Sequence, residues 1–295
     1  MKFLDPSLLA LAAVERAGSF DGAAAALGIT PSAVSQRIKH LEERVGAVLI
    51  QRGQPCVATD TGRKLCRHAE QVALLERGLT KDLGEAMSPD TAAIVRIAVN
   101  ADSVATWFLD ALKDQGDLLF DIVIDDQDHS ADLLRRGEVV AAISSSSTAV
   151  QGCDVTPLGA LRYIATANPD YRDRWFRDGV TLSALRKAPA MTYNMQDGLQ
   201  QQWIRQEIGQ GASLPSHYLP STQAFVLGAY LGIGWGMNPE ILVRDHMARG
   251  ALVGLGKIPH LDIPLYWQCN RLVSGPLRDI SKAIRQAAKR GLVQP

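Results

Sequence analysis

The sequence has no excess of charge of either sign. Its 295 residues carry 31 lysines and arginines against 31 aspartates and glutamates, so the formal net charge at pH 7 is zero. A protein that binds nucleic acid over its whole surface is strongly basic, and this composition argues against one. The basic residues are grouped locally, and the two groups are Arg37, Lys39 and Arg52, then Arg63, Lys64 and Arg67. A patch of this size is enough to anchor a few phosphates.

Cysteine and histidine are also scarce. The four cysteines lie far apart without a CxxC pair, and the six histidines show no metal-ligand spacing. We therefore expect reduced thiols, no metal site and no cofactor, with a redox-sensing cysteine pair as the less favoured alternative.

No hydrophobic run is long enough to span a bilayer, which takes about 20 apolar residues. Charged residues and a proline interrupt the apolar N-terminal stretch, and glycines interrupt the run at 224–237. The sequence thus predicts a cytoplasmic protein without membrane contact. Its 46% hydrophobic content is ample for buried cores, and its length suggests two or three domains.

Residues 19–45 carry a helix-turn-helix pattern. Gly28 separates two short helical segments and suits a tight turn. Thr30 is placed to cap the second helix, and Pro31 takes its first position, where a missing N–H costs nothing. The apolar residues that recur at helical spacing, and so predict a buried stripe, are Val34, Ile38, Leu41 and Val45.

The opposite face of this second helix offers hydroxyl, amide and ammonium groups, which hydrogen-bond base edges and phosphates. An ordinary surface helix with a solvated polar face is the alternative, but the turn and the cap favour a helix in a DNA major groove. Residues 49–59 add two short strands with a Gly/Pro turn, a wing whose Arg52 either reaches a phosphate or the minor groove, or is simply solvated. The candidate DNA-binding residues are Thr30, Pro31, Ser32, Ser35, Gln36, Arg37, Lys39 and Arg52.

A single long helix is predicted from residue 60 to about 87. Its heptad-like apolar residues indicate a dimer-forming linker, which would present two recognition helices to two DNA half-sites. Those residues are Leu65, Ala69, Val72, Leu79 and Leu83. Ser88-Pro89-Asp90 then ends the helix.

The rest of the chain alternates strands and helices. Strands at 94–99, 120–124 and 139–143 enclose helices at 102–113 and 131–136, which predicts a mostly parallel sheet with a ligand crevice at its carboxyl ends. A second alternating set of strands and helices follows at 163–237. A strand at 265–268 and a helix at 277–290 then close the chain. We expect a winged helix-turn-helix domain at 1–59, a linker helix at 60–88, and an effector domain at 89–295. That domain is α/β and two-lobed like a periplasmic binding protein, with lobe 1 at 92–162 and 266–295 and lobe 2 at 163–265.

The chain resembles the LysR-type transcriptional regulators along essentially its whole length. The residues that carry the resemblance are Gly18-Ser19-Phe20, Ala23-Ala24, the run from Thr30 to Ile38, Leu41-Glu42, Thr59-Asp60-Thr61-Gly62, Leu133, Arg135-Arg136-Gly137-Glu138 and Gly232-Ile233-Gly234. Asn238 and Val140 depart from the family's pattern. A closer similarity, to the ArgP/LysG branch, is carried by 98–109, 135–140, 187–190 and 265–267.

This resemblance implies an effector, lysine or arginine, and control of genes for basic amino-acid export and metabolism. It also implies homodimers that assemble into homotetramers, with RNA polymerase as a candidate partner. The alternatives are a LysR-type regulator with another effector, such as an aromatic or organic acid, and an architectural or replication-inhibiting DNA binder without effector. We find no catalytic constellation and expect no enzyme.

We expect an effector site where the first strand of the α/β part ends and the next helix begins, at residues 100–103. Free N–H groups there, with the hydroxyls of Ser103 and Thr106, suit an α-carboxylate, while Asp102 suits the α-ammonium group. Asp125 and Asp126, at the end of the next strand, could face the basic side chain of the effector. Plain helix capping is the alternative for Asp102 and Ser103, and a solvated loop is the alternative for Asp125 and Asp126. The candidate effector residues are Asn100, Asp102, Ser103, Thr106, Asp125, Asp126, Ser144, Thr192 and Gln223.

Overall fold

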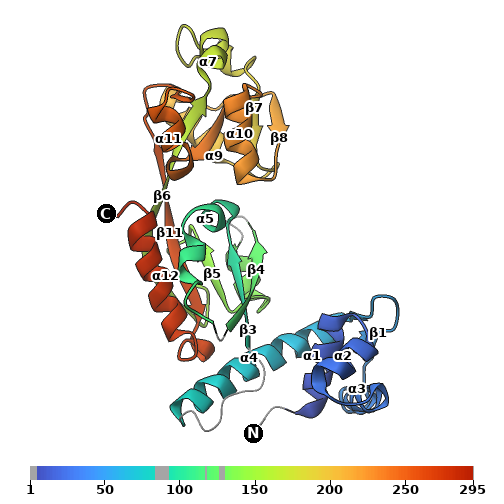
Figure 1. Cartoon of the computed structure of the whole chain (residues 1–295). Coiled ribbons are helices and arrows are strands. Elements are labelled where there is room, and N and C mark those ends of the chain that lie inside the picture. Colours follow the sequence, from blue (N-terminus) through green and yellow to red (C-terminus); the bar gives the residue numbers. More distant parts are fainter. Residues whose placement is uncertain (1–4, 84–92, 117, 126–129, 295) are drawn as a thin grey trace.

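The computed structural model describes residues 5–83, 93–116, 118–125 and 130–294. Figure 1 shows a helical N-terminal unit, a long helix that leads away from it, and an elongated α/β unit of two lobes. The predicted fold class is thus confirmed. Within the described residues, no helix is both long and apolar enough to cross a membrane. All four cysteines are free, and burial raises the pKa of the Cys66 and Cys269 thiols, which keeps them protonated.

The N-terminal unit (residues 5–58) forms from three capped helices and a wing. The side chains of Asp5, Ser19 and Thr30 each accept a hydrogen bond from a first-turn N–H, which satisfies otherwise unpaired donors. Gly28 ends the second helix with φ 64°, a conformation that favours glycine. The elements are α1 (Pro6–Ala17), α2 (Phe20–Leu27), α3 (Pro31–Val45), and the antiparallel strands β1 (Ile50–Gln51) and β2 (Val57–Ala58).

The predicted apolar stripe of α3 is buried except at its end. Val34, Ile38 and Leu41 are at most 3% exposed and join the core of this unit. Val45, in contrast, is 39% exposed, so its predicted burial was wrong. It is the last residue of α3, which ends at Gly46 with φ 72°.

Helix α4 (Asp60–Asp82) connects the two units. Cys66 and Ala69 are buried at its N-terminal half, whereas Leu74 joins the core of the α/β unit. Leu75 and Leu79 are 42% and 47% exposed. The predicted helix end at Ser88-Pro89-Asp90 lies outside the described residues.

The α/β unit (residues 93–294) is built on a seven-stranded sheet with the order β10-β6-β11-β5-β3-β4, and β9 pairs with β6. Strand β3 is parallel to β4 and β5, and the other pairings are antiparallel. The prediction of a mostly parallel sheet was therefore wrong. The strands are β3 (Ala93–Val99), β4 (Leu118–Ile124), β5 (Ala141–Ser144), β6 (Cys153–Ala167), β9 (Gly236–Pro239), β10 (Val253–Gly254) and β11 (Leu261–Asn270).

Two long antiparallel strands, β6 and β11, run through both lobes (Figure 1). Lobe 1 contains β3, β4 and β5, and lobe 2 contains β9 and a separate parallel pair, β7 (Ala190–Thr192) and β8 (Ser216–Tyr218). The helices of lobe 1 are α5 (Ala101–Thr106), α6 (Ser130–Arg135) and α12 (Arg278–Gly291). Those of lobe 2 are α7 (Pro169–Trp175), α8 (Leu182–Leu185), α9 (Leu199–Ile208), α10 (Thr222–Leu231) and α11 (Glu240–Ala248).

The helix predicted at 102–113 is broken after α5. Trp107 has φ −121° and its ring is buried, with Nε1 donating to the Ser103 Oγ at 3.1 Å. A 3-10 turn at Phe108–Ala111 follows. Burial of the indole within the core of lobe 1 thus outweighs continued helical propensity.

Glycine is required where α4 meets the wing. A Cβ at Gly62 would lie 2.1 Å from the Leu49 carbonyl oxygen, far closer than packing allows. We expect Gly62→Ala to lower the free energy of unfolding of the N-terminal unit by about 2 kcal/mol. Differential scanning calorimetry of the full chain measures this effect. The control is Gly53→Ala, where the Cβ would make an ordinary 3.4 Å contact, and equal transition temperatures for the two variants would contradict the prediction.

Candidate functional site

The polar face of α3 is open to solvent. Thr30 accepts the Ala33 N–H at 3.2 Å, and Pro31 is the first helical residue, as predicted. Thr30, Pro31, Ser32, Gln36 and Lys39 are exposed, and Ser35 and Arg37 are half-buried. The Lys39 ammonium lies 3.9 Å from Glu43, an exposed pair that costs little to break.

Arg52 on the wing is held against both helices of the helix-turn-helix. Its guanidinium lies 5.1 Å from the centroid of the Phe20 ring on α2, within the range of a cation–π interaction. Its Nη2 lies 3.5 Å from the Ser35 Oγ on α3. The three side chains join wing, α2 and α3 at one exposed edge. Sequence reasoning missed Phe20, because a local pattern does not show what its ring contacts.

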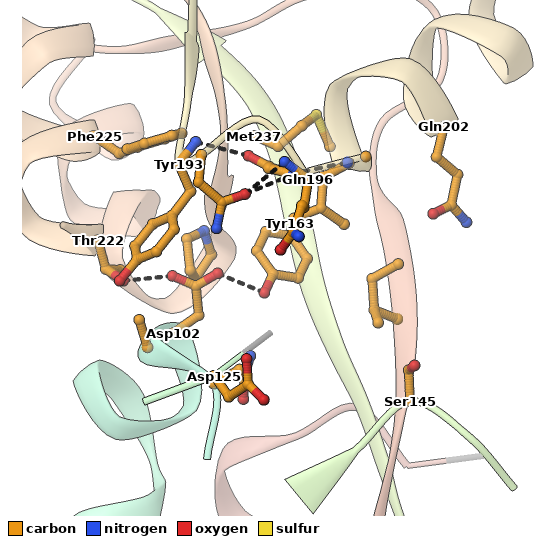
Figure 2. A pocket seen from close by; sticks show the side chains of 18 of the residues that line it. Asp102, Asp125, Ser145, Tyr163, Tyr193, Gln196, Gln202, Thr222, Phe225 and Met237 are labelled. Atoms are coloured by element: carbon orange, nitrogen blue, oxygen red, sulfur yellow. Dashed lines mark hydrogen bonds between the residues drawn. The ribbon is translucent and has the colours of Figure 1, made fainter. Parts of the chain in front are cut away.

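A cavity of about 570 Å³ lies between the two lobes, a size typical of small-ligand sites. On lobe 1 it is lined at the carboxyl ends of β3, β4 and β5, by Asn100 to Asp102, Ile124 and Asp125, and Ser145. On lobe 2 the walls include Tyr193, Gln202, Thr222 and Phe225, and Tyr163 comes from the crossing strand β6 (Figure 2).

Asp102 is the centre of a hydrogen-bond cluster in this cavity. The Tyr163 hydroxyl donates to its Oδ2 at 2.7 Å, and the Thr222 hydroxyl donates to its Oδ1 at 2.6 Å (Figure 2). Tyr193 lies close by, and burial together with the charge of Asp102 raises the pKa of the Tyr193 hydroxyl. At neutral pH this hydroxyl therefore stays protonated beside a carboxylate.

Asp197, another acid of the cavity wall, holds a loop together. Its carboxylate accepts hydrogen bonds from the backbone N–H groups of Tyr193 and Leu199 and from the Gln200 side chain. Within this loop, the Asn194 side-chain oxygen accepts hydrogen bonds from the backbone N–H groups of Gln196 and Asp197. Asp197 therefore fixes the loop that carries Tyr193 into the cavity.

The predicted effector residues divide into three groups. Asn100, Asp102 and Asp125 line the cavity. Five others do not appear in its wall: Ser103, Thr106, Ser144, Thr192 and Gln223. Asp126 lies outside the described residues.

The five residues outside the wall have other surroundings. Ser103 is fully buried and accepts the Trp107 indole N–H, and the Thr106 hydroxyl donates to the Asp102 carbonyl at 2.6 Å. Ser144 is buried and accepts the Ser146 N–H. Thr192 lies inside lobe 2, whereas Gln223 is exposed.

In three places the adjacent residue lines the cavity instead. Ser145 lines the cavity in place of Ser144, Tyr193 in place of Thr192, and Thr222 in place of Gln223. Tyr163, Gln202 and Phe225 were missed altogether. Within the described residues, no group of three His, Cys, Asp or Glu side chains is arranged to hold a metal ion.

Residues 7–63 match the bacterial regulatory helix-turn-helix proteins of the lysR family, and residues 90–289 match the LysR substrate binding domain. The chain is 46% identical over 283 residues to the HTH-type transcriptional regulator LysG of Mycobacterium tuberculosis, covering 96% of this chain and 93% of that protein. It is 40% identical over 293 residues to the regulator ArgP of Pseudomonas aeruginosa, covering 97% and 96%.

Solved structures agree. The crystal structure of ArgP from Mycobacterium tuberculosis is 44% identical with a TM-score of 0.79, and the match covers 100% of both chains. Full-length LysG from Corynebacterium glutamicum with bound effector Arg is 34% identical with a TM-score of 0.66, and the match covers 99% of this chain and 100% of that one. Two family models and near full-length relatives thus agree with the helix-turn-helix and the two-lobed unit, and the chain belongs to the LysR family of DNA-binding transcriptional regulators, in the branch of LysG and ArgP, and is not an enzyme.

Proposed function

We propose that the effector of this regulator is a basic amino acid, L-arginine or L-lysine, bound in the cavity between the lobes. The observation that carries the proposal is the Asp102 carboxylate, oriented in the cavity wall with Asp125 on the same lobe. Charge-assisted hydrogen bonds to such carboxylates favour a cationic ligand over a neutral one. The relative from Corynebacterium glutamicum, with its bound effector Arg, supports the same ligand class.

The cavity also gives each end of such a ligand suitable partners. Asp102 would accept the α-ammonium group, and Asp125 would face the cationic side chain. Asn100 and Ser145 line the same side of the cavity and carry donors suited to the α-carboxylate. The Ser103 hydroxyl accepts a hydrogen bond from the Trp107 indole, so we do not assign it to the α-carboxylate.

An organic-acid effector is the second candidate, and the charges of the wall disfavour it. Among the described lining residues three are aspartates, whereas the one cation is Arg205. Arg205 is exposed, so solvent screens its charge. We infer that the regulator responds to basic amino acids, and that the regulated genes serve the export or metabolism of these amino acids.

We further propose that α4 forms a dimer. Leu75, Leu79 and Leu83 recur every four residues and are 42%, 47% and 59% exposed. Burying such a row against a second copy removes apolar surface from water. The dimer would place two α3 helices on two half-sites, and pairs of dimers would make the tetramer.

On DNA, the exposed Ser32, Gln36 and Lys39 would enter the major groove with the N-terminal part of α3. Ser35 and Arg37 are half-buried and would contact phosphates beside them. Arg52 on the wing would bind a phosphate or the minor groove, with Phe20 holding its guanidinium in place.

The effector proposal predicts the behaviour of Asp102→Asn, which keeps the shape of the side chain and removes its charge. L-arginine at 100 times its Kd should stabilise the wild-type chain by about 2.7 kcal/mol. In the variant, Kd should rise by about thirtyfold, because the negative charge that strengthens the hydrogen bond to the cationic ligand is removed. Isothermal titration calorimetry measures both Kd values, and gel retardation should show unchanged basal DNA binding.

The matched control for this test is Asp178→Asn, an exposed carboxylate that does not line the cavity. Binding of an aromatic or organic acid, with no heat from arginine or lysine, would overturn the proposed ligand class. The DNA-binding assignment would stand in either case.

The DNA proposal predicts that Phe20 acts through Arg52. Phe20→Leu should weaken operator binding by about threefold, since an exposed cation–π contact contributes roughly 0.5–1 kcal/mol. In an Arg52→Ala background the same substitution should have no further effect. Fluorescence anisotropy with operator DNA at several salt concentrations gives the four affinities. A Phe20→Leu loss of equal size in both backgrounds would show that the ring serves only the packing of α2.

A further inference from the structure

Asp102 ties three parts of the α/β unit together. It belongs to α5 at the edge of lobe 1, and its two partners come from elsewhere in the chain. Tyr163 lies on β6, which runs between the lobes, and Thr222 is the first residue of α10 in lobe 2. The two hydroxyl contacts, at 2.7 and 2.6 Å, therefore join lobe 1 to the crossing strand and to lobe 2 (Figure 2).

Both donors are buried at this point. Tyr163 is 0% exposed and Thr222 is 6% exposed. A buried hydroxyl without a partner costs free energy, so each of these groups favours the lobe arrangement that brings it to Asp102. The carboxylate is thus held in one orientation from two sides.

The chemistry of these donors matters for a cationic ligand. Hydroxyl groups are neutral, so they orient the carboxylate without cancelling its negative charge. Asp262 on β11 shows the contrast, because Arg162 donates to both of its oxygens at 2.8 Å and lowers its pKa. Asp262 thus pairs with a cation, whereas the hydroxyl groups of Tyr163 and Thr222 that donate to Asp102 are neutral.

We infer that Tyr163 and Thr222 are positioning residues, which pre-organise Asp102 for the cationic group of the effector and make effector affinity depend on the spacing of the lobes. This inference rests on the proposed effector class. A pre-oriented carboxylate binds a cation more tightly because less ordering remains to be done on binding. By linkage, a ligand that binds this oriented carboxylate stabilises the lobe arrangement that orients it.

The test compares three single variants of the full chain. Thr222→Val removes the hydroxyl at constant size, Thr222→Ser keeps it, and Tyr163→Phe removes the phenolic donor. We expect Thr222→Val and Tyr163→Phe each to raise the Kd of L-arginine by about tenfold, as the loss of one such bond implies. Thr222→Ser should stay within about twofold of wild type, and Thr222→Val should add little in an Asp102→Asn background.

A second measurement does not involve a ligand. Amide hydrogen exchange of the ligand-free chain should become faster in α5 and at the start of α10 in Thr222→Val, and should stay at the wild-type rate in Thr222→Ser. Unchanged exchange in Thr222→Val would overturn the link between the lobes.

The outcomes separate this inference from the proposed function. If the wild type binds neither arginine nor lysine in calorimetry, the effector class fails, and hydrogen exchange still decides whether the hydroxyls link the lobes. If the wild type binds arginine and Thr222→Val and Tyr163→Phe bind it equally well, the positioning role is overturned. If Thr222→Ser loses as much affinity as Thr222→Val, the effect is one of packing and the positioning role is also overturned.

Discussion

The pairing of β6 with β11 is the constraint on which the α/β unit depends. The two strands pair from Leu261 with Tyr163 to Asn270 with Cys153, and the register shifts once, between Leu265 and Tyr266. Since both strands run through both lobes, one continuous ladder joins the lobes, while β7 and β8 of lobe 2 form a separate pair. The cavity lies beside these strands, which contribute Tyr163, Ile263 and Pro264 to its wall.

Local signals allowed the N-terminal unit to be predicted well. Caps, turns and helical periodicity act over a few residues, and Thr30, Pro31 and Gly28 take the predicted positions. The alternation of strands and helices in lobe 1 could also be predicted from the sequence. The antiparallel pairing of β5 with β11 was not, because it joins segments more than 100 residues apart whose contact no local pattern reveals.

The cavity between the lobes shows what a local sequence pattern does not reveal. Asn100, Asp102 and Asp125 line the cavity as predicted, whereas Ser144, Thr192 and Gln223 each lie one position from a residue that lines it. Successive side chains on a strand face opposite sides, and those on a helix turn by about 100° per residue, so a shift of one residue removes a side chain from the site. Asp102 and Thr222 are 120 positions apart, and only the folded chain brings them together.

Helix α4 offers a physical route from this cavity to DNA. Leu74 is buried in the core that includes β3 of lobe 1, and Gly78 allows Pro276 to approach, since a Cβ there would lie 2.9 Å from the proline ring. At its other end the same helix buries Cys66 in the N-terminal unit. A continuous helix transmits displacement as a nearly rigid body, so a shift of lobe 1 would move the wing and α3 with it, or bend α4. In a dimer joined through α4, either response changes the spacing of the two recognition helices, which is the quantity that an operator with two half-sites reads.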